Sequence, residues 1–172
     1  MKKHLTLLVA LCFLSVSTLA AELPKGIMKL DGRAAPALRL KDLDGTAYDL
    51  ATHRGQWMFV HFWAAWCGPC RKEMPKVQAL SDLIDSKKMG IWPINTAEDD
   101  DTVFIFLSSV APDLLTLMDP DGLVTEVWQP RGLPATFFVD PKGRLQYLAL
   151  GGRDWTAPVY LDFIKSLIGS SR

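Results

Sequence analysis

Long apolar runs alternate along this chain with short clusters of turn-forming residues. The strongest run covers residues 56–63, where nearly every position from Trp57 to Trp63 is apolar. A run without alternation is typical of a strand covered on both faces. Apolar residues at helical spacing follow over residues 67–85, which predicts a helix directly after this strand.

The rest of the chain continues the alternation of strands and helices. Residues 38–40 and 46–50 flank an Asp-Gly turn and predict a hairpin, whereas residues 21–34 are expected to be a loose lead-in. Further strands are expected over residues 90–95, 114–118, 135–139 and 144–150, and further helices near residues 98–110, 123–128 and 158–168. The apolar positions expected on inner helix faces are Val77, Leu80, Leu83, Ile84, Val159, Phe163, Ile164 and Leu167, and the apolar positions of the helix near residues 98–110 are Val103, Phe104, Phe106, Leu107 and Val110. This order predicts an α/β domain over residues 35–172, with a mixed sheet flanked by helices.

The first twenty residues form a segment of another kind. Lys2 and Lys3 precede an apolar stretch over residues 5–14, and small residues lead to Ala20. This order is typical of a secretory signal peptide. The apolar stretch is shorter than the roughly 20 residues that a membrane span needs. We therefore expect a periplasmic protein, with an uncleaved inner-membrane anchor over residues 1–20 as the alternative; membrane contact is expected only if that segment is retained.

Composition narrows the classes of partner and of chemistry. The chain has 172 residues, 49% of them hydrophobic, which is enough for one domain with a core. Its formal net charge is zero, and Lys and Arg form no stripe, so a nucleic-acid partner is not expected. Of three cysteines, Cys12 lies in the leader, which leaves Cys67 and Cys70 in the domain.

The spacing of this pair favours redox chemistry. A structural disulfide between Cys67 and Cys70 would close a very small loop and stabilise little. A cysteine at a helix start has a lowered pKa and is nucleophilic as the thiolate, so Cys67 is the expected exposed nucleophile, and Cys70 lies one turn later to resolve it. Gly68 permits the tight turn, and Pro69 is tolerated in a first turn. Zinc would need further ligands, and His53 and His61 lack suitable spacing.

Two stretches resemble the thioredoxin superfamily. The segment Phe-Trp-Ala-Ala-Trp-Cys-Gly-Pro-Cys over residues 62–70 is similar to its active-site signature, and Gly-Leu-Pro-Ala-Thr-Phe over residues 132–137 precedes a strand. The resemblance implies a thioredoxin-like fold, with a cis bond at Leu133–Pro134 that faces the cysteines beside a docked substrate strand. An ordinary trans proline is the alternative.

Within the superfamily, the chain resembles the TlpA-like branch, which includes ResA-type and DsbE-type oxidoreductases. The resemblance spans about residues 33–168. It rests on the pattern CxxCxxExP, which ends at Glu73 and Pro75, on the hairpin near Ala35 and Pro36, and on a longer stretch before Trp128. It implies an N-terminal β-hairpin and a central insertion.

Three further residues are candidates for the site. The resemblance associates Glu73 with the active site and with proton movement; a solvated helix glutamate is the alternative. His61 occupies the strand position where thioredoxins have a buried aspartate, and a histidine can accept a proton near neutral pH. A structural histidine with one satisfied hydrogen bond is the other interpretation. Trp66, next to Cys67, is expected to cover one side of the docking groove.

The expected activity is thiol–disulfide exchange with a protein substrate. Cys67 and Cys70 would reduce a client disulfide without metal, nucleotide or flavin. The resemblance implies a membrane thiol reductant of the DsbD or CcdA type as electron source and cytochrome c maturation as one pathway. The alternatives are a disulfide oxidant or isomerase, a non-catalytic thioredoxin-fold module, and a Cu(I)-binding protein, since thiolates favour Cu(I).

Overall fold

A computed structural model describes residues 22–169. The strands are β1 (Ile27–Lys29), β2 (Arg39–Asp42), β3 (Ala47–Asp49), β4 (Trp57–Trp63), β5 (Met89–Thr96), β6 (Leu117–Asp119), β7 (Ala135–Val139) and β8 (Leu145–Leu150), and the helices are the 3-10 helix η1 (Leu50–His53), α1 (Gly68–Leu83), α2 (Asp100–Val110), α3 (Leu123–Trp128) and α4 (Pro158–Gly169). The strands form one sheet in the order β1-β8-β7-β4-β5-β6-β2-β3. Strand β4 pairs in parallel with β5 and antiparallel with β7, so the predicted mixed sheet is confirmed.

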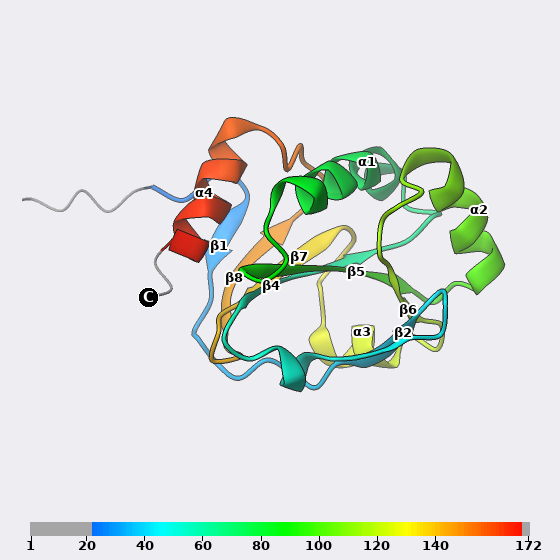
Figure 1. Cartoon of the computed structure of the whole chain (residues 1–172), viewed down its shortest axis with the longest axis horizontal. Coiled ribbons are helices and arrows are strands. Elements are labelled where there is room, and N and C mark those ends of the chain that lie inside the picture. Colours follow the sequence, from blue (N-terminus) through cyan, green and yellow to red (C-terminus); the bar gives the residue numbers. More distant parts are fainter. Residues whose placement is uncertain (1–21, 170–172) are drawn as a thin grey trace, which may run out of the picture.

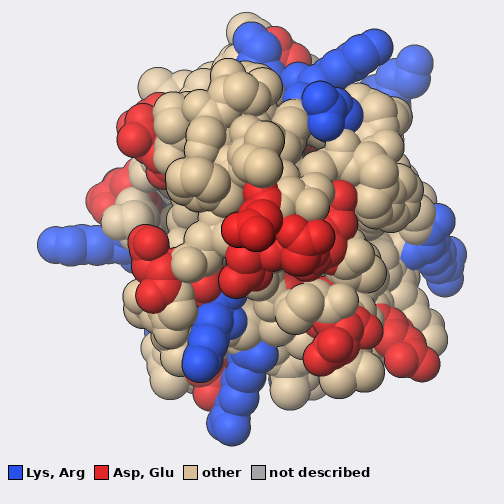
Figure 2. Space-filling view, turned by 90° about the vertical axis from the view of Figure 1, so that its right-hand side faces the viewer, with Lys and Arg blue, Asp and Glu red and all other residues tan. Residues whose placement is uncertain are grey.

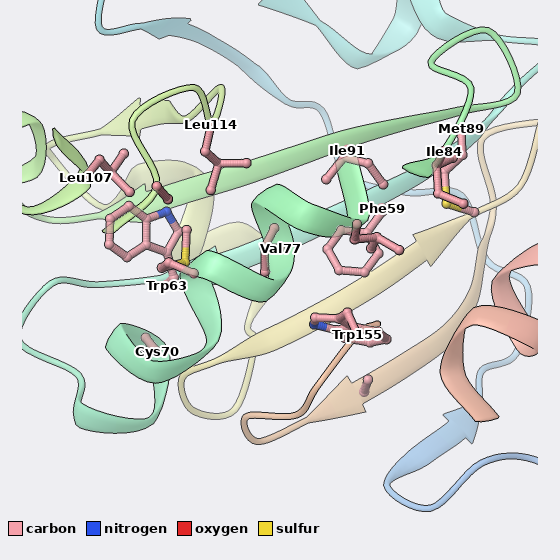
Figure 3. Close-up of a cluster of buried hydrophobic side chains, with 14 of the residues drawn as sticks. Phe59, Trp63, Cys70, Val77, Ile84, Met89, Ile91, Leu107, Leu114 and Trp155 are labelled. Atoms are coloured by element: carbon pink, nitrogen blue, oxygen red, sulfur yellow. The ribbon is translucent and has the colours of Figure 1, made fainter. Parts of the chain in front are cut away.

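Strand β4, which the sequence predicted from its longest apolar run, lies at the centre of the sheet. Every residue of β4 is buried, because helices or loops cover both of its faces. Figure 1 shows α1, α2 and α4 above the sheet and α3 below it. In Figure 3, Phe59, Trp63 and Val77 lie between α1 and the sheet, and Cys70 belongs to the same buried cluster. The cysteine pair therefore lies at the border of the hydrophobic core.

The N-terminal region differs from the expectation in one respect. The predicted hairpin is present as β2 and β3, which pair antiparallel. The expectation of a loose lead-in over residues 21–34 is wrong for Ile27–Lys29, because this segment is β1 and pairs with β8. A bridge between Ala34 and Arg144 extends the contact. An edge strand of three residues, with only Ile27 buried, is too short to show a period in the sequence.

Two apolar residues expected on inner helix faces, Leu83 and Val159, point outward instead, and so does the apolar Phe104 of α2. Helix α1 ends at Leu83, and the next residue, Ile84, takes the buried position. Phe104 is turned away from the sheet because its neighbour Val103 occupies the inner face of α2.

Acidic side chains gather at the centre of the face on the right of Figure 1, with Lys and Arg around them (Figure 2). Asp42 of the hairpin and Asp100 of α2 line one cavity of about 820 Å³ in this part of the molecule. Asp99 caps α2 by accepting a hydrogen bond from the Thr102 amide. Within residues 22–169, no helix has the length and apolar character needed to cross a membrane.

Candidate active site

The two domain cysteines meet at the first turn of α1, where they form a disulfide with their Cα atoms 5.2 Å apart. Cys67 is the N-cap, and its Sγ accepts a hydrogen bond from the Cys70 amide at 3.4 Å. The free amides and the dipole of a helix N-terminus stabilise a negative charge there. The sequence suggested an exposed Cys67, but only 6% of this residue is exposed. Cys70 is 0% exposed. Cys67 is nevertheless the more accessible of the two.

The expected docking residues surround the end of β4. Trp66 is 67% exposed, directly before Cys67. The Leu133–Pro134 peptide bond is cis, as expected. Ala135, which follows this bond, pairs with Phe62 of β4, and Leu133 packs against the core cluster that includes both cysteines. Strand pairing therefore brings the Leu133–Pro134 bond to the same edge of the sheet as the disulfide.

Glu73 is buried behind the cysteine pair, in the second turn of α1. Only 2% of the residue is exposed, so the alternative of a solvated helix glutamate is wrong. Its Oε1 accepts a hydrogen bond from the Arg153 amide at 3.2 Å. Burial raises the pKa of Glu73 to about 8, against the opposing effects of that hydrogen bond and of the Arg153 charge. The carboxyl group therefore holds its proton at neutral pH.

His61 lies beside this carboxyl group and is fully buried. Its Nδ1 forms a 2.8 Å hydrogen bond with Oγ1 of Thr136 on β7. Its Nε2 is 3.9 Å from Oε2 of Glu73, and neither of these two atoms has a hydrogen-bond partner among the described residues. Burial, and secondarily the Arg153 charge, lowers the pKa of His61 to about 3, so the imidazole is neutral at pH 7. The neutral imidazole of His61 can therefore accept a hydrogen bond, but it does not readily take up a proton at neutral pH.

Glu98 also supports the site, although the sequence indicated only that it belongs to an acidic helix start. Its Oε2 accepts hydrogen bonds from the Ala65 amide at 2.7 Å and from Nδ2 of Asn95 at 2.6 Å. Glu98 thus ties the loop before Cys67 to the end of β5. A usable signal was present, since β4 and β5 are parallel and the residues that follow them meet at one edge.

Arg153 is a second residue that the sequence did not single out. It follows β8 in a loop whose Gly152 comes so near α1 that a Cβ atom there would lie 3.3 Å from the Pro69 carbonyl oxygen. Pro69, Glu73 and Arg153 line a common cavity of about 520 Å³. No periodicity in this loop indicates such an approach.

Zinc binding was the alternative interpretation of the cysteine pair. No group of three or more His, Cys, Asp or Glu side chains within residues 22–169 is arranged to hold a metal ion. His53 hydrogen-bonds the Asp49 carbonyl and packs edge-on against Trp92 of β5. Cys12 lies outside the described residues.

Known proteins resemble this chain in sequence and in fold. The sequence model of the AhpC/TSA family matches residues 32–148. The thiol–disulfide oxidoreductase ResA of Bacillus subtilis is 28% identical over 145 residues, which cover 84% of this chain and 81% of ResA.

Two solved structures extend the comparison. A Chlorobium tepidum protein assigned as the thiol:disulfide interchange protein DsbE is 25% identical, with a TM-score of 0.72 over 80% of this chain and 97% of the other. The thioredoxin domain of a Bacteroides vulgatus thiol–disulfide oxidoreductase is 26% identical, with a TM-score of 0.66 over 79% and 96%. The chain therefore belongs to the AhpC/TSA family, has the thioredoxin-like fold, and is a thiol–disulfide oxidoreductase of the ResA and DsbE type.

Proposed function

We propose that this protein is an exported reductase of protein disulfides. The observation that carries the proposal is the position of Cys67 as the N-cap of α1, with its Sγ facing the Cys70 amide. In the reduced protein the same geometry favours the Cys67 thiolate. Cys67 is also the more accessible residue of the pair, which makes it the attacking group.

The reaction proceeds through a mixed disulfide. The Cys67 thiolate attacks one sulfur of a client disulfide, and the second client sulfur leaves as a thiolate that takes a proton from solvent. Cys70 then gives its proton to the ionised Glu73 carboxylate and attacks Cys67, which forms the Cys67–Cys70 disulfide; the first client sulfur leaves as a thiolate and takes a proton from solvent. Two electrons pass to the client, and the enzyme is oxidised.

Buried side chains assist the second step. Cys70 and Glu73 are three residues apart on α1, so they lie on the same helix face. We assign Glu73, in its ionised form, to accepting the Cys70 proton, and we assign His61, whose Nε2 lies 3.9 Å from Oε2 of Glu73, to orienting the carboxyl group. Trp66, Gly68, Pro69, Leu133 and Pro134 are proposed to receive the client segment around the disulfide.

The direction of electron transfer and the compartment of the protein are the next parts of the proposal. The leader predicted over residues 1–20 supports export, and the periplasm is an oxidising compartment. A reductase there needs a dedicated electron source, which we propose to be a membrane thiol transporter of the DsbD or CcdA type. Cysteines of apocytochrome c are the proposed client, in keeping with the TlpA-like branch.

Reduction of insulin with dithiothreitol as electron donor tests the activity. We expect the wild-type protein to accelerate reduction and Cys67→Ala to lose the acceleration, whereas Cys70→Ala should accumulate a mixed disulfide. Activity of Cys67→Ala equal to wild type would contradict the proposal. The equilibrium potential of the pair against glutathione tests direction: a reductase should lie below about −200 mV, and a value near −120 mV would indicate an oxidant.

A further inference from the structure

Arg153 contacts the proposed proton carrier and the N-terminal lead-in at the same time. Its backbone amide donates the hydrogen bond to Oε1 of Glu73. Its guanidinium group donates to the main-chain carbonyls of Leu150 at 2.7 Å, Gly151 at 3.1 Å and Lys25 at 3.2 Å. These hydrogen bonds hold the side chain in one place between the lead-in and the end of β8.

Aromatic rings hold the same guanidinium from another side. Its Cζ lies 5.0 Å from the ring centre of Trp155 and 5.2 Å from that of Tyr160. A cation over an aromatic face is stabilised by the ring quadrupole. Tyr160 also donates a hydrogen bond from its hydroxyl to the Lys25 carbonyl, so α4 and the lead-in enclose Arg153 together.

The lead-in is shaped for this contact at Gly26. Its φ of 78° lies in the left-handed region, and a Cβ atom there would lie 3.3 Å from the Arg153 guanidinium nitrogens. Glycine alone combines this backbone conformation with the close approach. The segment just before β1 is thus fitted to Arg153.

The charge of Arg153 acts on both members of the buried pair. It lowers the pKa of Glu73 because a cation favours the carboxylate, and it lowers the pKa of His61 because it disfavours a second cation. Lys72, Lys76 and Asp154 line the same cavity, and Lys76 pairs with Asp154 at 3.3 Å. Arg153 thus differs from these lysines in that it also donates its backbone amide to the carboxyl group.

We infer that Arg153 is a positioning residue of the exchange reaction, which fixes the Glu73 carboxyl behind the cysteines and is itself held by the N-terminal lead-in. The inference rests on the role that the proposed function gives to Glu73. Arg153 acts through Glu73 and touches neither sulfur nor client. Its charge should set the pH at which Glu73 releases its proton, and hence the pH range of fast exchange.

The test compares Arg153→Met, which removes the charge, with Arg153→Lys, which keeps it. Arg39→Met is the matched control, since Arg39 pairs with Asp49 on the hairpin and takes no part in the site. Titration of the Glu73 carboxyl carbon by NMR gives a readout independent of activity. The pH profile of insulin reduction gives the second.

Arg153→Met keeps the backbone amide that bonds Glu73 and removes only the charge, so it should raise the pKa of Glu73 by about one pH unit and move the reduction profile upward in pH. Arg153→Lys should restore most of the wild-type titration, and Arg39→Met should match the wild type. If Arg153→Met does not fold, Arg153→Gln replaces it with the same expectation.

Two results would overturn the inference. One is a Glu73 titration in the charge-removing variant that superimposes on the wild type; the other is an equal shift in Arg153→Lys. Either result, in a protein that still reduces insulin, would leave the proposed function intact. Absence of reduction by the wild type would contradict the proposed function instead, while the NMR titration would still decide the role of Arg153.

Discussion

His61 and Glu73 face each other inside the protein, with Nε2 of the imidazole 3.9 Å from Oε2 of the carboxyl group. Burial raises the pKa of one and lowers that of the other, to about 8 for Glu73 and about 3 for His61. Between these two pH values His61 is a neutral imidazole and Glu73 is a protonated carboxyl group. The buried pair is therefore uncharged at neutral pH, although it consists of an acid and a base.

Replacing Glu73 with Gln should change how stability depends on pH. The pKa of Glu73 is about 8 in the folded protein and near 4.5 when unfolded, so the folded state binds more protons between these values. Stability from this group is present below about pH 4.5 and is lost as the pH rises towards 8. From pH 5 to pH 8 the wild type should therefore lose about 3 kcal/mol relative to Glu73→Gln. Urea unfolding at both pH values measures this; parallel pH dependences would show that Glu73 is not held protonated.

His61 should make the stability of the wild type depend on pH in the opposite direction, and His61→Asn should lack this dependence. The pKa of His61 is about 3 when folded and near 6.5 when unfolded, so its contribution is present above about pH 6.5 and is lost as the pH falls towards 3. Between pH 6.5 and pH 4 the wild type should lose about 3 kcal/mol that His61→Asn retains. The same variant tests the mechanism through the rate at which Cys70 reacts. An unchanged pH profile of Cys70 reactivity would remove His61 from the proposed reaction.

Two tryptophans near the site should respond in different ways to substitution by alanine. Trp66 is largely exposed, so Trp66→Ala should change the free energy of unfolding by less than about 0.5 kcal/mol while raising KM for a protein client. Trp63 is fully buried and donates its indole N–H to Thr116, so Trp63→Ala should cost about 3–5 kcal/mol. Client kinetics and denaturant unfolding of both variants separate the two roles. Unaltered client kinetics in Trp66→Ala would argue against its place in the docking groove.

Glu98→Ala should loosen the loop that carries Cys67. The carboxylate oxygen accepts from the Ala65 amide and from the Asn95 side chain, and its removal leaves both donors without this partner. The expected cost is about 1.5–3 kcal/mol of stability, together with slower insulin reduction. Glu98→Gln keeps one oxygen acceptor and should recover part of both losses. Equal stability of wild type and Glu98→Ala would mean that the loop does not depend on this residue.

The sequence predicted those parts of the molecule in which local pattern and tertiary structure agree. The uninterrupted apolar run of β4 could be identified because both faces of that strand are covered. The helix start at Cys67 followed from the spacing of the pair and from Pro69. Burial of Glu73 could not be predicted, because it depends on the approach of Gly152 and Arg153 from a loop 80 residues away. A helix pattern alone cannot show what a distant loop covers.

The hairpin and the lead-in show the same contrast at the edges of the sheet. An Asp-Gly turn between two short runs was sufficient to predict the pairing of β2 with β3. Strand β1 has only three residues, and its pairing with β8 joins segments more than a hundred residues apart. Its place is determined by tertiary contact and leaves no local signal.

The ionisation of Cys67 is the most direct test of the account. Alkylation of the reduced, folded protein with iodoacetamide across pH, followed by mass spectrometry of each cysteine, measures it residue by residue. We expect Cys67 to react first and with a pKa below the ordinary value of about 8.5, while Cys70 reacts far more slowly. A Cys67 that stays protonated and unreactive at pH 7, or one that reacts no faster than Cys70, would contradict the account.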